Sequence, residues 1–199
     1  MHSEIVQFIN SKVSGANAQS EQREVGDTPV YVDAGSLHEV CEALKTDEKW
    51  AFKVLQVITG CDYPDDQTIE VSYILANFFK DHEVILKVKL PRDNPKVDSV
   101  CDLWSSADFQ ERECFDMVGV EFNNHPDHRR ILCPDDWEGF PLRKDYVAQK
   151  MYKHMEVYPE DKMNNDIRGY DSISKAAFKD GGKLVDRPEV GLKNELRGQ

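Results

Sequence analysis

Apolar residues recur at helical spacing in two segments near the start of the chain. In residues 3–13 they fall on one face of a helix: Ile5, Phe8 and Ile9. In residues 37–45 they form an i, i+3, i+4, i+7 stripe: Leu37, Val40, Cys41 and Leu44. Ser36 and Glu39 have the spacing of a capping box, so we expect the second helix to begin at residue 37.

Alternating or continuous apolar runs predict strands in residues 29–32, 51–59, 68–79 and 84–90. The connections between the last three are short, so we expect these strands to be antiparallel neighbours. The run at 51–59 is apolar on both faces, which favours a central strand. Residues 130–132 are expected to form one more short strand.

These elements predict an α+β fold, with helices packed on a small mixed or antiparallel sheet whose other face is partly wet. We expect residues 1–28 to form an N-terminal helix and a linker, and residues 29–147 to form the core domain. Apolar residues after 147 are scattered without a period. Residues 148–199 are therefore expected to be an extended C-terminal arm that gains order on a partner.

A third helix is expected around residues 107–118, ended by Gly119. One face is apolar apart from a single carboxylate: Ala107, Glu111, Cys114, Phe115 and Val118. A second row, Asp108, Arg112 and Asp116, has i, i+4 spacing and is expected to pair along the outer face.

Glu111 is expected to be a buried carboxylate, because it lies on the apolar stripe. Such a group is paired, or it is neutralised by a raised pKa. We expect a later cation to meet Glu111 or Glu113, and the candidates are Arg129, Arg130, Arg143 and Lys144. Glu111 and Glu113 point to different faces of a helix, so they do not form an acid–base pair, and no catalytic residue is expected.

The net charge of −12 argues against a nucleic-acid partner. No apolar run approaches the roughly 20 residues of a membrane span and no signal peptide is visible, so a cytosolic or peripheral membrane location without insertion is expected. The chain has five cysteines and no C-x-x-C pair. They predict reduced core thiols and neither a zinc nor an iron–sulfur site.

His125 and His128 have i, i+3 spacing, which raises the alternative of a metal- or anion-binding enzyme. Pro126 disfavours a helix there and no further ligand cluster completes the set, so a turn that positions Arg129 and Arg130 is favoured. Trp137-x-Gly139-x-Pro141-Leu142 predicts a rigid turn, and a Trp-Pro surface beside arginine is typical of an interaction hot spot. The residues indicate an interaction subunit better than an enzyme.

Three ordered blocks carry a family resemblance. They are Glu111-Arg112-Glu113-x-x-Asp116-Met117-x-Gly119-Val120-x-Phe122, then His125-Pro126-Asp127-x-Arg129-Arg130-Ile131-Leu132, then Asp136-Trp137-x-Gly139-x-Pro141-Leu142-Arg143-Lys144-Asp145-Tyr146. Together they resemble the 30-kilodalton subunit of proton-pumping NADH:quinone oxidoreductase (respiratory complex I), over roughly residues 30–147. Single departures from the family pattern are His128, Cys133 and Val147.

The resemblance implies a non-catalytic peripheral-arm subunit that binds no cofactor or metal itself, with FMN and iron–sulfur clusters in partner subunits. The partners would be the quinone-pocket subunit and the subunit of the terminal iron–sulfur cluster, on the cytoplasmic side of the cell (inner) membrane. The residues implied to hold the fold and the interface are Glu111, Arg112, Glu113, Asp116, Gly119, His125, Pro126, Arg129, Arg130, Trp137, Gly139, Pro141, Leu142, Arg143, Lys144, Asp145 and Tyr146. An equivalent scaffold subunit of a membrane-bound hydrogenase or related dehydrogenase is the alternative.

Overall fold

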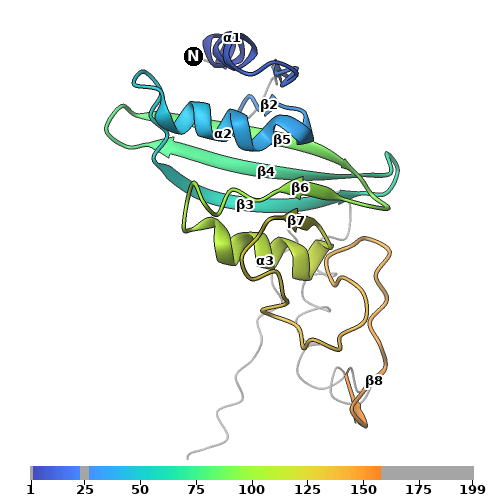
Figure 1. Ribbon diagram of the computed structural model, residues 1–199. Coiled ribbons are helices and arrows are strands. Elements are labelled where there is room, and N and C mark those ends of the chain that lie inside the picture. Colours follow the sequence, from blue (N-terminus) through green and yellow to red (C-terminus); the bar gives the residue numbers. More distant parts are fainter. Residues whose placement is uncertain (1, 23–26, 158–199) are drawn as a thin grey trace, which may run out of the picture. The chain divides into compact units, whose positions relative to one another are not determined.

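The computed structural model describes residues 2–22 and 27–157 (Figure 1). By internal contacts the chain divides into two units, Met1–Val147 and Ala148–Gln199. The first unit contains, in chain order, α1 (His2–Lys12), β1 (Gln19–Ser20), β2 (Val30–Tyr31), the 3-10 helix η1 (Ala34–Ser36), α2 (Leu37–Thr46), β3 (Val54–Tyr63), β4 (Thr68–Asn77), β5 (His82–Pro91), β6 (Lys96–Asp98), α3 (Ala107–Val118) and β7 (Glu121–Asn123). All of the α-helices expected from the sequence are present.

A five-stranded sheet of order β1-β2-β5-β4-β3 forms the centre of the first unit. Strands β3, β4 and β5 are antiparallel neighbours, as their short connections predict. Strand β2 runs parallel to β5, which makes the sheet mixed. Strands β6 and β7 form a separate parallel pair. The predicted α+β class is confirmed.

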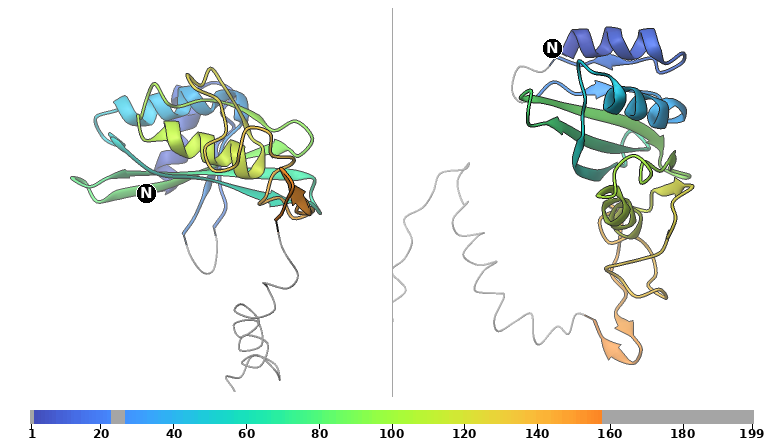
Figure 2. Two further views of the ribbon diagram at one scale, coloured as in Figure 1. Left: turned by 90° about the horizontal axis from the view of Figure 1, so that it is seen from below. Right: turned by 60° about the vertical axis from the view of Figure 1, so that its left-hand side comes forward.

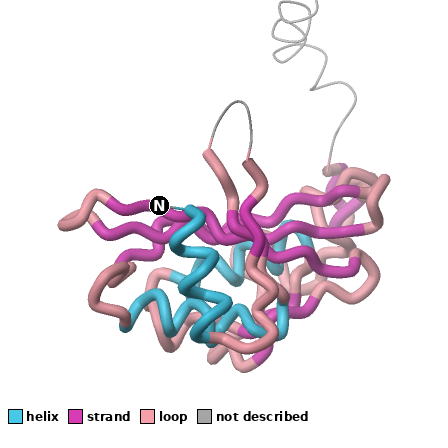
Figure 3. Tube along the Cα trace, turned by 90° about the horizontal axis from the view of Figure 1, so that it is seen from above, coloured by secondary structure: helices cyan, strands magenta, loops and turns pink. Residues whose placement is uncertain are grey.

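One face of the sheet carries the core. In β5 the side chains of Val84, Leu86, Val88 and Leu90 are buried, while the residues between them are exposed or half-buried. Helices α2 and α3 lie on the same side of the strands in two opposite views (Figures 2 and 3). The prediction of one helix-covered face and one partly wet face is therefore confirmed.

Strand β3 is an edge strand of the sheet, so the prediction of a central position is wrong. Helix α3 packs along this strand, and only some of its apolar residues are buried, since Leu55 and Ile58 are covered while Val57 is exposed. The side chain of Gln110 accepts a hydrogen bond from the Ile58 amide (2.5 Å) and donates one to the Gln56 carbonyl (3.3 Å). Helix α3 thus satisfies backbone groups that a neighbouring strand would otherwise bind.

Gly60 allows the close approach of α3 to β3. A Cβ atom at this position would lie 2.8 Å from the Cys114 sulfur, which is closer than side chains approach in folded proteins. The absence of a side chain at Gly60 therefore sets the distance between the helix and the strand.

Two smaller expectations are corrected near the N-terminus. Ser36 precedes α2 but makes no capping hydrogen bond with its side chain, so the predicted capping box is wrong. The expected linker contains the short strand β1. Asn10 fixes the chain before this strand, because its side chain bonds both backbone groups of Ala18.

The expected arm falls in the second unit. Its described part contains a hairpin of β8 (Met151–Tyr152) and β9 (Met155–Glu156), which the sequence pattern did not predict. Lys153 and His154, between the strands, both have positive φ angles, as a two-residue hairpin turn requires. The extended conformation expected for residues 158–199 lies outside the described residues.

Candidate functional site: an ion-paired segment folded onto α3

After Gly119 the chain reverses and contacts α3 again. Gly119 has φ +85°, and its amide donates to the carbonyls of Cys114 and Phe115, which confirms the predicted helix end. We call residues 125–147 the return segment. Within it, the Leu142 amide donates a hydrogen bond to the Met117 carbonyl of α3 (2.9 Å).

Asp116 binds the return segment to α3, and its side chain is fully buried. One carboxylate oxygen accepts from Arg130 Nη1 (2.6 Å). The other accepts from three consecutive backbone amides, those of Ile131 (3.1 Å), Leu132 (2.7 Å) and Cys133 (2.8 Å). Burial acts to raise the pKa of Asp116, but these hydrogen bonds outweigh it, and the pKa lies below the usual 3.8.

This arrangement corrects two expectations. Residues 130–132 form no strand, because the amides of Ile131 and Leu132 donate to a side chain and not to a neighbouring strand. Arg112 and Asp116 do not pair with each other on an outer face, since both are buried and their partners lie in the return segment.

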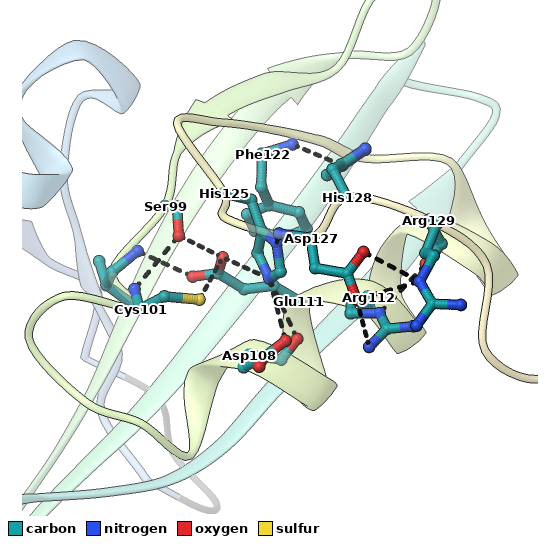
Figure 4. Close-up of polar contacts among 11 residues, drawn as sticks. Ser99, Cys101, Asp108, Glu111, Arg112, Phe122, His125, Asp127, His128 and Arg129 are labelled. Carbon is teal, nitrogen blue, oxygen red and sulfur yellow. Dashed lines mark hydrogen bonds and ion pairs between the residues drawn. The ribbon is translucent and has the colours of Figure 1, made fainter.

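Glu111 occupies a separate buried cluster (Figure 4). Its carboxylate accepts from Ser99 Oγ (2.6 Å), the Val100 amide (2.8 Å) and the Cys101 thiol (3.3 Å). Burial raises the pKa of Glu111, and the hydrogen bonds only partly offset this rise. The burial of Glu111 was predicted correctly.

The prediction that a cationic side chain pairs with Glu111 or Glu113 is wrong. Among the residues that the structure describes, no arginine or lysine side chain bonds either carboxylate, and Glu113 is exposed. Arg130 binds Asp116 instead, and the buried Glu111 is satisfied by uncharged donors. A carboxylate surrounded by uncharged donors is held at a fixed place but is not offered to a substrate.

His125 lies against the Glu111 cluster. Its side chain is fully buried, and its Nε2 is 3.8 Å from Glu111 and 3.6 Å from Asp108. Ligand atoms of Cys101, Glu111 and His125 lie within 4.8 Å of one another, which is close enough for a metal site.

The hydrogen bonds of the His125 ring argue against a metal ion. Its Nδ1 accepts from the Asp127 amide (3.0 Å), so the neutral ring carries its proton on Nε2. Nε2, the nitrogen that faces Glu111 and Asp108, then has no lone pair for a metal. This tautomer supports the sequence-based expectation that the chain binds no metal, which stays a prediction.

Arg112 and Arg129 meet at Asp127. The Asp127 carboxylate lies 3.3 Å from Arg112 Nη1 and 2.9 Å from Arg129 Nε. Arg112 Nε also donates to the Arg129 carbonyl (3.2 Å). The turn that begins at His125 and the exposed Pro126 thus positions two arginines, Arg129 and Arg130, as the sequence predicts.

A further group of contacts closes the C-terminal end of α3. Arg143 Nε donates to the Val118 carbonyl (2.7 Å), and the guanidinium groups of Arg130 and Arg143 lie over the Phe140 ring. Trp137 Nε1 donates to the Tyr146 hydroxyl (3.0 Å), so the indole is held within the predicted turn. Gly139 has φ +78°, as the tight turn between these aromatic residues requires, and Pro141 lies in the next turn.

Two residues that hold the site were missed by the sequence reasoning. Asp62 of β3 and Arg92 after β5 form an ion pair (2.7 Å), and Arg92 also binds Asp145 (2.6 Å). The Lys144 amide donates to Asp62 (2.9 Å). The hydrogen bond from Arg92 is the main cause of the lowered pKa of Asp62. No local pattern marks this pair, because its partners in the return segment are 53 and 82 residues away.

Several charged groups of the return segment are therefore bonded within the first unit, while several large apolar side chains are exposed. Leu132 and Leu142 are 61% and 60% exposed, and their amides bond the adjacent residues Asp116 and Met117 of α3. Phe109 of α3 and Val147 are also exposed. This combination of a fixed backbone and exposed apolar side chains is typical of a protein-binding surface.

The fold and these contacts define a small α+β protein whose charged residues hold the return segment against α3. Residues 30–152 match the family described as "Respiratory-chain NADH dehydrogenase, 30 Kd subunit", and the chain belongs to this family.

Two bacterial relatives support the assignment, and both are named as NADH-quinone oxidoreductase subunits. The relative from Moorella thermoacetica is 46% identical over 130 residues, which cover 65% of this chain and 86% of that protein. The relative from Chloroherpeton thalassium is 41% identical over 114 residues, or 57% of this chain. The match spans only 48% of that longer relative.

Two solved structures are similar. A chain of the membrane-bound sulfane sulfur reductase, described as an archaeal respiratory membrane complex, superposes with a TM-score of 0.62 at 27% identity over 80% of this chain and 96% of that chain. A trypsin-resistant fragment of Nqo5 superposes with a TM-score of 0.51 at 26% identity over 64% of this chain and 99% of that chain.

Proposed function

We propose that this chain is a non-catalytic subunit of the peripheral arm of an NADH:quinone oxidoreductase (complex I). It would support electron transfer from NADH through iron–sulfur clusters to quinone, coupled to proton translocation, by holding the quinone-site subunit in place. The observation that carries the proposal is that the family match at residues 30–152 contains the whole return segment.

The use of the charged residues supports a scaffold and not a catalyst. Asp116, Asp62 and Asp127 each bind an arginine of the same unit, and Glu111 is fully buried. These carboxylates stabilise the fold and are not free to transfer protons to a substrate.

The exposed leucines supply the contact that we propose with the partners. Leu132 and Leu142 would meet the quinone-pocket subunit, because their backbone is fixed on α3 while their side chains face outward. The subunit of the terminal iron–sulfur cluster would be a further neighbour.

We propose that FMN and the iron–sulfur clusters belong to partner subunits. An iron–sulfur cluster takes four cysteine thiolates as a rule. In the described part of the chain, the one candidate ligand group holds a single cysteine, Cys101. Cys41 and Cys114 are buried, and burial raises the pKa of the Cys114 thiol to about 12. Such thiols behave as core residues.

We propose a peripheral location on the cytoplasmic side of the cell (inner) membrane. Among the described residues, no helix is both long and apolar enough to cross a bilayer. Protease digestion of membrane vesicles tests the side. The tagged chain should be cleaved in inverted vesicles and protected in right-side-out ones, and the reverse pattern would contradict the proposal.

Co-purification tests the function. The chain is tagged in its native host, the membranes are solubilised gently, and the recovered material is assayed for NADH-dependent quinone reduction. Recovery with flavin and iron–sulfur subunits and with this activity is the expected result. Recovery as a lone soluble chain would contradict the proposal.

A second candidate is a scaffold subunit of another respiratory membrane complex, such as a hydrogenase. The similarity to a chain of the membrane-bound sulfane sulfur reductase supports this second candidate, because that chain belongs to a different respiratory membrane complex. The same purification separates the two, because a nickel-bearing partner, or activity without NADH, would identify the second.

A further inference from the structure

Two histidines of the return segment accept hydrogen bonds from backbone amides. His125 Nδ1 accepts from the Asp127 amide (3.0 Å), and His128 Nε2 accepts from the Phe122 amide of β7 (3.1 Å). The two rings are neighbours, with centroids 5.9 Å apart (Figure 4). A backbone N–H is always a donor, so the ring nitrogen that faces it must hold a lone pair.

We propose that His128 forms a pH-sensitive latch, which holds the start of the return segment against β7 and α3 only while its imidazole is neutral. An imidazolium carries a proton on both nitrogens and accepts no hydrogen bond. Protonation of the His128 ring therefore breaks its bond to the Phe122 amide or forces the ring to turn out of its site.

The surroundings of His128 strengthen the latch. Its ring packs on Phe115 of α3, with centroids 4.2 Å apart, and it faces Phe122 of β7. Burial among these rings, together with the neighbouring His125, lowers the pKa of His128 below the usual 6.5, although the Glu121 carboxylate of β7 acts in the opposite direction.

His125 lies beside the latch and contacts other groups. Its Nε2 faces the carboxylates of Asp108 and Glu111 on α3, and the Cys101 thiol lies beside them. Its Nδ1 bonds the amide of Asp127, which belongs to the return segment itself. The bond that joins the return segment to β7 is the one made by His128.

The direction of the effect follows from the lowered pKa of His128. Between pH 6.5 and the lower folded value, the unfolded chain binds a proton that the folded chain does not. Stability therefore falls as the pH falls through this range, and the folded-to-unfolded ratio drops by up to about tenfold per pH unit because of His128.

The test is urea denaturation of the full chain, without a histidine tag, at pH values between 8 and 5. The wild type should lose stability on acidification. His128→Gln, whose side-chain oxygen can accept the Phe122 amide without titrating, should remove most of this loss. His154→Asn, in the turn of the β8–β9 hairpin, is the matched control and should keep the wild-type pH dependence. An equal pH dependence in His128→Gln and the wild type would overturn the proposal.

Nuclear magnetic resonance of the wild-type chain provides a second test, which does not depend on the folding of a variant. The His128 ring should titrate below its usual pKa, and hydrogen-exchange protection of the Phe122 amide should decrease as it titrates. A His128 pKa at or above 6.5, or amide protection that does not change, would overturn the latch. The latch concerns this chain alone, so its failure is distinguishable from failure of the proposed function.

Discussion

Asp116 shows how one residue can determine the path of a long segment. Its two oxygens accept four hydrogen bonds, one from Arg130 and three from consecutive amides of the return segment. A buried carboxylate is favourable only when it is paired and its remaining lone pairs are satisfied. Both conditions are met here, because the charge of Arg130 and the amides are supplied by the same stretch of chain.

Replacement of Asp116 by Asn should destabilise the fold strongly. Asn has one acceptor oxygen, and its NH₂ group would face either Arg130 or the backbone amides, all of which are donors. Breaking a buried ion pair costs about 3–5 kcal/mol, and we expect a loss in this range by urea denaturation. Asp135→Asn, an exposed position in the same segment, is the control and should cost less than about 0.5 kcal/mol. Equal denaturation midpoints for both variants would show that Asp116 does not hold the segment.

Acidification below pH 4 should also release the return segment. The pKa values of Asp62 and Asp116 lie below the usual 3.8 in the folded chain, so both carboxylates contribute stability above this pH. That contribution is lost as the pH falls through the folded values. The denaturation midpoint should fall steeply in this range, and less steeply in Asp116→Asn, which has lost one of the two groups. Parallel curves for the wild type and the variant would contradict this account.

Helix α3 is the element that joins the sheet to the return segment. One side approaches β3 at Gly60, and its C-terminal end is closed by Gly119 and the ring of Phe140. Helix α3 packs on β3, and Leu55 and Ile58 of this strand are buried while Val57 is 41% exposed. Apolar residues on both faces of a strand therefore do not by themselves place it at the centre of a sheet.

Gly119→Ala should lower the free energy of unfolding by more than about 1 kcal/mol, the cost of a left-handed conformation for a residue with a side chain. The added Cβ would also lie 2.6 Å from the Phe140 ring. Gly35→Ala is the matched control, since a Cβ there meets nothing within 4 Å. Chemical denaturation of the two variants should separate them, and equal stabilities would mean that the end of α3 adapts freely.

Gly60→Ala should push α3 away from β3, at a cost of about 1–3 kcal/mol for overpacking. Cys114→Ala removes the sulfur atom that the new Cβ would meet. The double variant should therefore be more stable than the sum of the single effects predicts, by about 1 kcal/mol in a double-mutant cycle. Strict additivity would show that the helix and the strand are not in close contact at this position.

At the scale of the whole chain, the ion pairs and the exposed apolar side chains of the return segment serve different purposes. The ion pairs hold the return segment, and the exposed leucines remain available for a partner. The family membership supplies the setting in which a partner is expected.

Leu142→Asp should weaken assembly without unfolding the chain, because Leu142 is 60% exposed. A hot-spot side chain is worth about 2 kcal/mol or more, so affinity for the partner protein should fall about 30-fold. The measurement is the recovery of the complex from the native host, together with circular dichroism of the free chain. Phe79→Asp, at an exposed position outside the return segment, is the control. Full recovery of the complex with Leu142→Asp would place the interface elsewhere.

Local sequence patterns were sufficient to predict the helices and most of the strands, and to identify the family. The helix periods, the antiparallel strands, the end of α3 at Gly119 and the burial of Glu111 follow from residues close together in the chain, because they depend on backbone geometry and on which faces are apolar. The ordered motif blocks of the return segment were sufficient for the family, which the match at residues 30–152 confirms.

The tertiary structure alone decided which charges pair. The sequence offers several arginines and several carboxylates in one region, and their spacing cannot rank the combinations. Arg130 binds Asp116 and not Glu111, and Arg92 reaches Asp145 across 53 residues. A hydrogen bond acts over about 3 Å in space and is indifferent to separation along the chain. Only the packing of α3 against β3 and the return segment determines which donors come within that distance.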